Sequence, residues 1–143
     1  WSRALALLQE ARLMQLSPGP ITCTAVLSAC EKGEAWQHAL ALLAEAREGG
    51  LQLTVLAFNA AASACEKARV WRQALGAFKD MQERGLEPNS ITHNAAICAC
   101  GKSSQWRPAL RLLSRLQRRG FAPDEVACGA CVRACEAVQQ WVQ

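Results

Sequence analysis

The sequence predicts an all-α fold, a right-handed α-solenoid of stacked antiparallel helix pairs built from 35-residue repeats. Three observations predict it: an internal period, two helical hydrophobic patterns in each period, and a glycine after each second pattern. The period is carried by two residue columns: Trp1, Trp36, Trp71, Trp106 and Trp141, and Cys30, Cys65, Cys100 and Cys135. A fixed period of this length is typical of repeat arrays, whose units stack in sequence order and share one core.

The period divides the chain into three complete repeats and two partial ones. The partial repeat 1–19 comes first, the complete repeats 20–54, 55–89 and 90–124 follow, and the partial repeat 125–143 ends the chain. Because every complete repeat carries the same pattern, the same two helices are expected in each, and each partial repeat is half of such a unit.

Each complete repeat opens with a helical stripe of apolar residues. In the repeat 20–54 the stripe comprises Cys23, Val26, Leu27 and Cys30, a spacing that places them on one face of an α-helix. The matching residues are Phe58, Ala61, Ala62 and Cys65; His93, Ala96, Ile97 and Cys100; and Cys128, Cys131, Val132 and Cys135. We therefore expect a first helix in each segment with this stripe buried.

A second stripe follows in each repeat, beginning in the repeat 20–54 with Trp36, Ala39 and Leu40. The connection 31–35 is short, so we expect the two helices to pack antiparallel. The second helix should end before a glycine, where a left-handed cap favours a residue without a Cβ. These glycines are Gly50, Gly85 and Gly120.

The tryptophans are large enough to fill the space between one repeat and the next. We therefore expect Trp1 and Trp141, at the two ends of the column, to lack a neighbour on one side.

The composition limits the class of protein. Of 143 residues, 51% are hydrophobic and 20% charged, which suits a folded core and not a disordered chain. No segment approaches the roughly 20 apolar residues of a membrane-spanning helix, so no membrane partner is expected. The formal net charge is +4, and the segments 1–54, 55–89 and 90–143 carry −1, +1 and +4. Positive charge thus increases toward the C-terminal end.

The eight cysteines lie within the apolar helical segments, so we expect free thiols in a reducing compartment. Cys128 and Cys131 form a C-x-x-C, and Cys98 and Cys100 lie one repeat earlier. Four thiolates can bind zinc, but structural zinc pairs usually lie on converging turns. We therefore expect packing and no metal.

The sequence offers no catalytic constellation. No carboxylate pair, Ser/His/Asp set or glycine-rich phosphate loop recurs in register, so we expect neither an enzyme nor a cofactor. His38 and His93 are out of register with each other, and we expect them on the surface or lining a groove.

The repeats resemble the pentatricopeptide repeat family. The likeness is carried by ITCTAVLSACEKGEAWQHALALLAEAREGGLQ, LAFNAAASACEKARVWRQALGAFKDMQERGLEP and ITHNAAICACGKSSQWRPALRLLSRLQRRGFAPD, and it covers essentially the whole chain. The resemblance implies sequence-selective binding of single-stranded RNA, one base per repeat, on the concave face made by the first helices. It also implies a role in organellar RNA processing and a location in the mitochondrion or chloroplast.

By the same resemblance, a residue early in each first helix reads a base together with the last residue of that repeat. The pairs are Thr24 with Thr54, Asn59 with Asn89, and Asn94 with Asp124. The third pair implies uracil and the second a pyrimidine, more often cytosine, while Thr54 departs from the family's usual residues and leaves the first base unnamed. Gly129, at the matching place in the last segment, has no side chain with which to read a base.

The resemblance further implies that apolar side chains at the start of successive first helices sandwich each base. These are Ile21, Leu56, Ile91 and Val126. A lysine column, Lys32, Lys67 and Lys102, matches a place where the family contacts phosphate, and the last segment departs from it with Ala137. Independently of the family, an amide offers both a donor and an acceptor to a base edge, and aligned lysines favour a phosphate backbone.

Alternatives remain open at this point. Asn59 and Asn94 could instead cap the first helices, and Glu31 and Glu66 could neutralise the adjacent lysines. Four arginines of the last second helix are expected to be solvated: Arg111, Arg115, Arg118 and Arg119. The concave face could also bind protein partners, as tetratricopeptide arrays do. The RNA interpretation requires both asparagine amides to lie side by side along an open trough.

Overall fold

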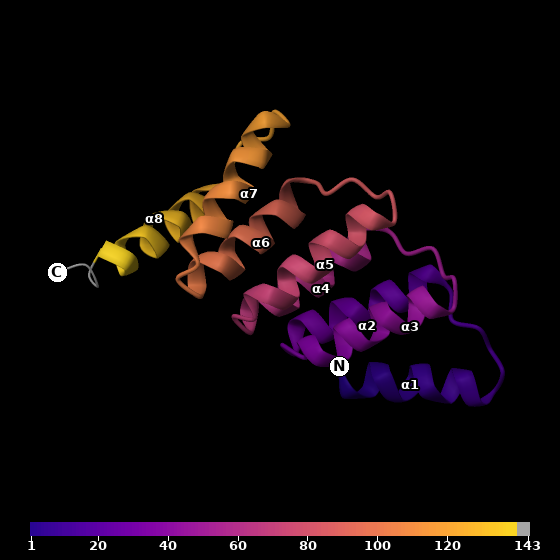
Figure 1. Ribbon diagram of the computed structural model, residues 1–143. Helices are drawn as coiled ribbons and strands as arrows, with labels where there is room; N and C mark the ends of the chain where they lie inside the picture. The colour runs from indigo at the N-terminus through magenta and orange to yellow at the C-terminus, as the bar shows by residue number, and fades with distance from the viewer. Residues whose placement is uncertain (140–143) are drawn as a thin grey trace.

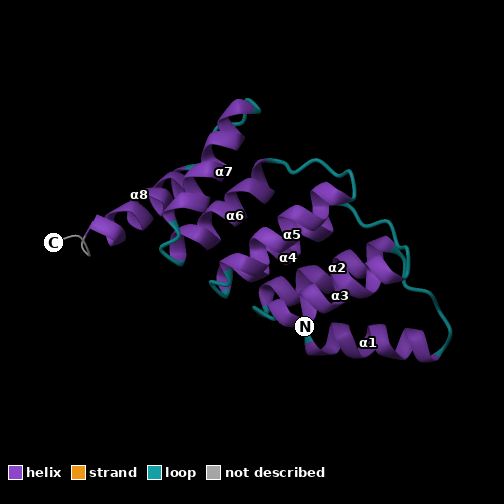
Figure 2. Ribbon diagram, viewed as in Figure 1, coloured by secondary structure: helices purple, strands orange, loops and turns teal. Residues whose placement is uncertain are grey.

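The computed structural model describes residues 1–139, which form eight helices and no strand (Figures 1 and 2). The helices are α1 (Ser2–Leu13), α2 (Pro20–Lys32), α3 (Trp36–Glu48), α4 (Val55–Lys67), α5 (Trp71–Glu83), α6 (Ser90–Lys102), α7 (Trp106–Arg118) and α8 (Glu125–Gln139). They stack in sequence order from α1 at one end to α8 at the other (Figure 1). The predicted all-α solenoid of antiparallel helix pairs is confirmed.

The first helices form a continuous layer, because α2 packs on α4, α4 on α6 and α6 on α8. Each second helix packs on the first helix of its own repeat and on that of the next, as α5 does on α4 and α6. Contacts therefore run between neighbouring repeats, as in other solenoids.

The turns follow the sequence pattern with one adjustment. Gly50, Gly85 and Gly120 have φ values of 67°, 75° and 79°, so the predicted left-handed caps after the second helices are confirmed. The connection inside a repeat is shorter than 31–35, because α2 continues to Lys32 and leaves only residues 33–35.

The core is built from the predicted stripe of the first helices. Leu27, Phe58 and Ile97 are almost completely buried, and the cysteine column is buried at Cys30, Cys65 and Cys100. His93 is also buried and makes an edge contact with Phe78, with ring centroids 4.9 Å apart. The expectation of a surface or groove position for His93 was wrong, because its place in the stripe points into the stack.

The stripe predicted for α8 is partly wrong. Its buried residues are Ala127, Ala130, Cys131 and Ala134. Val132 is 55% exposed, and Cys128 and Cys135 are only half-buried. Within the described residues α8 is packed only by α6 and α7, so one side of it lacks a neighbour.

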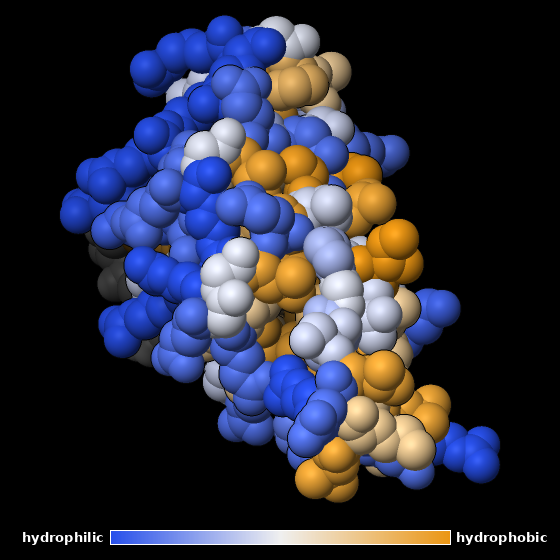
Figure 3. Space-filling model, turned by 90° about the vertical axis from the view of Figure 1, so that its right-hand side faces the viewer, coloured by the Kyte–Doolittle hydropathy of each residue, from blue (hydrophilic) through white to orange (hydrophobic). Residues whose placement is uncertain are grey.

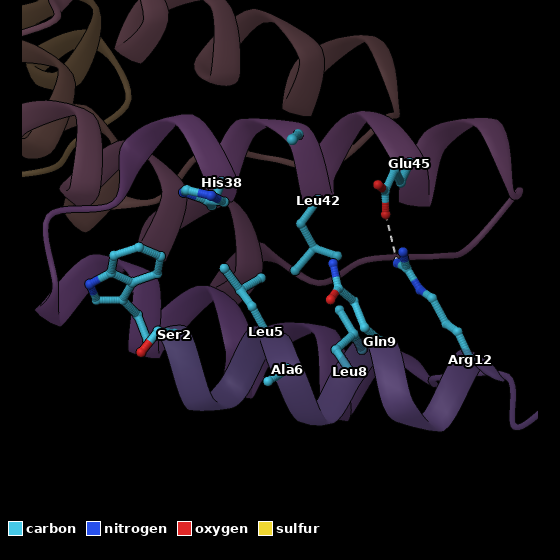
Figure 4. Close-up of a pocket in the computed structure, with 11 residues that line it drawn as sticks. Ser2, Leu5, Ala6, Leu8, Gln9, Arg12, His38, Leu42 and Glu45 are labelled. Atoms are coloured by element: carbon cyan, nitrogen blue, oxygen red, sulfur yellow. Dashed lines mark ion pairs between the residues drawn. The ribbon is translucent and has the colours of Figure 1, made fainter. Parts of the chain in front are cut away.

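The first residues pack more loosely than the rest. A cavity of about 330 Å³ lies between α1 and α3, lined by Leu5, Leu8 and Leu42 among others (Figure 4). At one end of the cavity Arg12 forms an ion pair with Glu45, with Nη2 and Oε2 2.6 Å apart. The expected end position of Trp1 is confirmed, because its ring is 46% exposed and stacks at a tilt beside His38. Trp141 lies outside the described residues.

Candidate functional site

Four exposed apolar side chains mark the starts of the first helices. Each is the second residue of its helix: Ile21 of α2, Leu56 of α4, Ile91 of α6 and Val126 of α8. They are 86%, 65%, 55% and 60% exposed. A single exposed apolar residue is ordinary, but four in one register form a repeated surface feature. Hydrophobic residues are distributed along the edge that carries the connections between repeats (Figure 3).

The last residue of each complete repeat is the N-cap of the next first helix. Thr54, Asn89 and Asp124 precede α4, α6 and α8. The Asn89 side chain accepts from Thr92 N at 3.1 Å, and Asp124 Oδ1 accepts from Ala127 N at 2.7 Å. The capping role considered for Asn59 and Asn94 is therefore wrong, because both lie inside their helices and the partner residues make the caps.

Asn94 and Asp124 line one pocket with the two flanking apolar residues. The pocket has a volume of about 240 Å³, and its remaining lining is Ser63, Glu66, Ala95 and Cys98. Ile91 and Val126 are the exposed apolar members of this lining. The Oδ1 atom of Asn94 is buried and has no hydrogen-bond partner among the described residues. A buried acceptor without a partner is unfavourable, so the polar group of Asn94 is left unsatisfied beside this pocket.

Asn59 and Asn89 also meet, but their site is closed. Asn59 is 6% exposed, its Nδ2 donates to Asn89 Oδ1 at 3.4 Å, and its Oδ1 accepts from the Thr92 hydroxyl. The expectation that both amides lie open along a trough was therefore wrong for Asn59. The physical reason is that the hydroxyl of Thr92, on the next first helix, donates to the carbonyl of Asn59. The carbonyl of Asn94 has no such partner among the described residues.

The first predicted pair is not joined. Thr24 uses its only hydroxyl proton on Pro20 O, 2.7 Å away, within its own helix. Thr54 makes no side-chain cap bond to α4 and is exposed. No hydrogen bond links the two threonines in the described structure.

Two of the three column lysines are engaged. Lys67 Nζ lies 3.5 Å from Glu31 Oε1, and Lys102 Nζ lies 2.6 Å from Glu66 Oε1. Each glutamate thus pairs with the lysine of the following repeat and not with its sequence neighbour. Lys32 is exposed and makes no ion pair among the described residues. The column is therefore partly neutralised.

The cysteines behave as core residues. Burial raises the pKa of Cys98 to about 11 and that of Cys100 to about 12, so both thiols are protonated and unreactive at neutral pH. No group of three or more potential ligands for a metal ion occurs in residues 1–139. Nor is any helix in that range long and apolar enough to cross a membrane.

The sequence analysis missed Thr92 as a functional candidate. Thr92 is fully buried and contacts both Asn59 and Asn89. A signal was present, because its column reads Thr22, Ala57, Thr92 and Ala127, and a threonine on a buried face is unusual. Its partners, however, belong to another repeat and only the fold brings them together.

Family and structural comparisons agree on this architecture. The PPR repeat family model matches residues 53–102 and the PPR repeat model matches residues 91–121. No curated protein sequence matches the chain.

Several solved structures are similar to the chain. The pentatricopeptide repeat protein PPR10 in complex with an 18-nt psaJ RNA element is 28% identical, with a TM-score of 0.71 over 90% of this chain and 19% of that one. PPR10 from maize alone is 25% identical, with a TM-score of 0.71 over 96% of this chain and 20% of that one. The chain thus spans about a fifth of the length of PPR10.

The PPR domain of Arabidopsis thaliana protein-only RNase P 1, in complex with tRNA, is 14% identical. Its TM-score is 0.82 over 96% of this chain and 73% of that one, a likeness that concerns the fold alone.

Proposed function

Because the chain belongs to the pentatricopeptide repeat family, we propose that it binds single-stranded RNA sequence-selectively along the starts of its first helices. Each base inserts between two successive members of the exposed apolar series. The polar pair that contacts the base edge is Asn94 with Asp124, because the pair Asn59 with Asn89 is closed and Thr24 and Thr54 are not joined. A relative of the chain, PPR10, was solved with an RNA element, which supports the choice of ligand class.

The Asn94 pocket is the observation that carries the proposal. It combines a buried carbonyl without a partner, the Asp124 carboxylate and two exposed apolar side chains. Both polar groups accept hydrogen bonds, which suits an N–H at the centre of the Watson–Crick edge, as in uracil N3, and the family resemblance implies uracil for this pair. The apolar pair supplies surfaces on which the base faces pack. Uracil is therefore the base proposed for this repeat.

Backbone contacts would come from exposed cations of the array. Lys32 is exposed, and the segment 90–143 carries a net charge of +4, which favours phosphate without sequence preference. The family resemblance further leads us to place the function in organellar RNA processing, in the mitochondrion or chloroplast. Fluorescence imaging of the tagged parent protein in cells tests that location, and a purely nuclear signal would contradict it.

Binding of three fluorescent RNA hexamers, U6, C6 and alternating CUCUCU, tests the function by anisotropy. We expect affinity to fall with salt between 50 and 200 mM. Asn94→Ala should weaken U6 by about tenfold or more and C6 far less. Gln73→Ala, on the exposed side of α5, is the matched control and should change neither.

Equal binding of all hexamers at any salt concentration, or no binding at low salt, would contradict the proposal. The concave face would then be better explained as a protein-binding scaffold of the tetratricopeptide type.

A further inference from the structure

Five arginines lie along one exposed side of the second helix α7. Their spacing places them on one face, which we call the arginine stripe: Arg107, Arg111, Arg115, Arg118 and Arg119. All five are exposed, whereas Ala109, Leu112 and Leu116 of the same helix face the core. Because an α-helix rises about 1.5 Å per residue, the stripe extends over about 18 Å. It belongs to a second helix, and so it is separate from the first helices on which the single strand is proposed to bind.

The charge of the arginine stripe is not neutralised within the described residues. No member of the stripe forms an ion pair there. Arg107 lies over the ring of Trp106, with its Cζ atom 5.1 Å from the ring centroid, and this contact leaves its charge in place. Members that are four residues apart repel each other, which destabilises a helix. The folding of α7 therefore gives no reason for the stripe.

The other second helices carry a different charge at the matching positions. In α5 these positions hold Arg72, Gly76, Asp80, Glu83 and Arg84, and in α3 they hold Gln37, Ala41, Glu45, Glu48 and Gly49. Two arginines and two carboxylates cancel in α5, two glutamates give −2 in α3, and the stripe carries +5. The positive face is thus a property of α7 and not of the repeat.

A series of ion pairs between neighbouring second helices ends where the stripe begins. The two pairs join Arg12 of α1 to Glu45 of α3, 2.6 Å apart, and Arg47 of α3 to Asp80 of α5, 3.5 Å apart. One repeat later the same two positions hold Gln82 and Arg115. The carboxylate of the series is replaced by a cation, so Arg115 lacks the partner that would continue it.

A row of unpaired guanidinium groups suits a ligand with closely spaced negative charges. Each guanidinium can donate two parallel hydrogen bonds to a phosphate. The centre of a protein interface is usually apolar and poor in charge, but Leu110, at 37%, is the one exposed large apolar residue of α7. The stripe therefore fits the phosphate backbone of a nucleic acid better than it fits a protein.

An RNA double helix suits the stripe better than a single strand does. A double helix carries about twice the charge per unit length of one strand, and its backbone is already ordered before binding. We propose that the arginine stripe of α7 is a second RNA-binding site, which binds the phosphate backbone of a double-helical segment without sequence preference. Because this site is separate from the Asn94 pocket, one transcript can place a single strand on the first helices and a stem on α7.

Binding of a blunt RNA duplex of about 16 base pairs, measured by anisotropy beside U6, tests this inference. The stripe variant combines Arg111→Gln, Arg115→Gln and Arg118→Gln, because glutamine forms helices about as well as arginine does. At about 50 mM salt this variant should bind the duplex about tenfold more weakly or worse. The slope of log Kd against log salt should fall by about 2.7, since each phosphate contact contributes about 0.9.

A charge-matched variant is the control. Arg3→Gln, Arg72→Gln and Lys79→Gln together remove the same formal charge from exposed positions of α1 and α5. This variant should retain the duplex affinity within about threefold and should bind U6 as the stripe variant does. A third variant with lysine at the positions 111, 115 and 118 keeps the charge and should keep the salt dependence.

Backbone amide signals in 15N NMR spectra locate the duplex on the unaltered chain, even if the stripe variant does not fold. Addition of the duplex should shift the signals of α7 and leave those of α3 in place. Shifts confined to other helices would overturn the site. Unchanged duplex binding by a folded stripe variant, or equal losses in the stripe variant and the charge-matched variant, would also overturn it.

Polyglutamate tests an acidic protein as the ligand. If it binds the stripe more tightly than the duplex does, and the stripe variant loses that binding, the assignment to RNA is overturned. The proposed function is tested separately, because Asn94→Ala leaves the stripe intact and should not change duplex binding. If the duplex binds and U6 does not, the proposed function fails while the stripe stands.

Discussion

The junction between α4 and α6 and the junction between α6 and α8 use matching positions with different results. In the first, Asn59, Asn89 and Thr92 form a closed network of hydrogen bonds. In the second, Asn94 and Asp124 line an open pocket and one buried oxygen has no partner. The same residue type, asparagine, can therefore stabilise one junction of a repeat array and be available for ligand binding at the next.

The second junction contains a close approach of two helices, α6 and α8, which gives the largest expected effect. A Cβ on Gly101 would lie 2.7 Å from Ala130 O and 2.8 Å from Ala130 C, so α8 could not keep its place against α6. We expect Gly101→Ala to lower the free energy of unfolding by about 2 kcal/mol in urea titrations and to weaken U6 binding.

The control for this prediction is Gly76→Ala on the exposed side of α5, where a Cβ meets nothing within 4 Å. It should stabilise the chain by about 0.5 to 1 kcal/mol, because alanine is the better helix former. Equal effects of the two variants would show that close packing does not build the second junction.

Replacing Asn59 should mainly lower stability, whereas replacing Asn94 should mainly weaken RNA binding. Asn59→Ala leaves Thr92 and Asn89 with lost partners and should cost about 1 to 2 kcal/mol of unfolding free energy. Asn94→Ala removes an acceptor that has no partner and should leave that free energy within about 0.5 kcal/mol of the original. Thermal and urea unfolding of the two variants measure this. A greater loss of stability for Asn94→Ala would reverse the assignment of the two junctions.

The stability of the junction between α4 and α6 should also depend on pH through His93. Burial lowers the pKa of His93 from its usual 6.5, and its Nδ1 lies 2.9 Å from Asn89 O. The folded chain therefore favours the neutral ring, so stability is fully present above pH 6.5 and falls as the pH drops through the lowered value. We expect the Tm to fall by a few degrees between pH 7.5 and 5.

His93→Phe, which copies Phe58 of the preceding repeat, should remove part of this pH dependence. His38→Gln serves as the control because His38 is exposed. If both variants keep the full pH dependence, other groups are responsible for it.

The smallest effects concern the lysine column, whose ion pairs join α2 to α4 and α4 to α6, whereas α8 carries Ala137 at the matching place. Lys67 and Lys102 each form a partly exposed ion pair across a junction, and removing either pair should change stability by at most about 1 kcal/mol. Lys32 makes no such pair, so Lys32→Gln should lower the salt dependence of U6 binding by about 0.7 in the logarithmic slope. A larger change for Lys102→Gln than for Lys32→Gln would show that the ion pairs open on binding.

Much of the fold could be predicted from particular residues. The tryptophan and cysteine columns indicated the period, the stripes indicated the helices, and Gly50, Gly85 and Gly120 marked where the second helices end. These features are local, because helix periodicity and left-handed caps depend on neighbours within a few residues. That Asn94 and Asp124 line one pocket agrees with the pairing that the resemblance to the pentatricopeptide repeat family implied.

The sequence by itself determined the helix pairs, their order and the residue types that meet at each junction. It did not determine which side chains of different helices form contacts. Tertiary packing alone decided that Thr92 reaches Asn59 and that Lys102 pairs with Glu66 instead of facing solvent. Each of these contacts joins residues of different helices, and the proton or charge of one side chain can satisfy only the partner that the stack brings within about 3 Å.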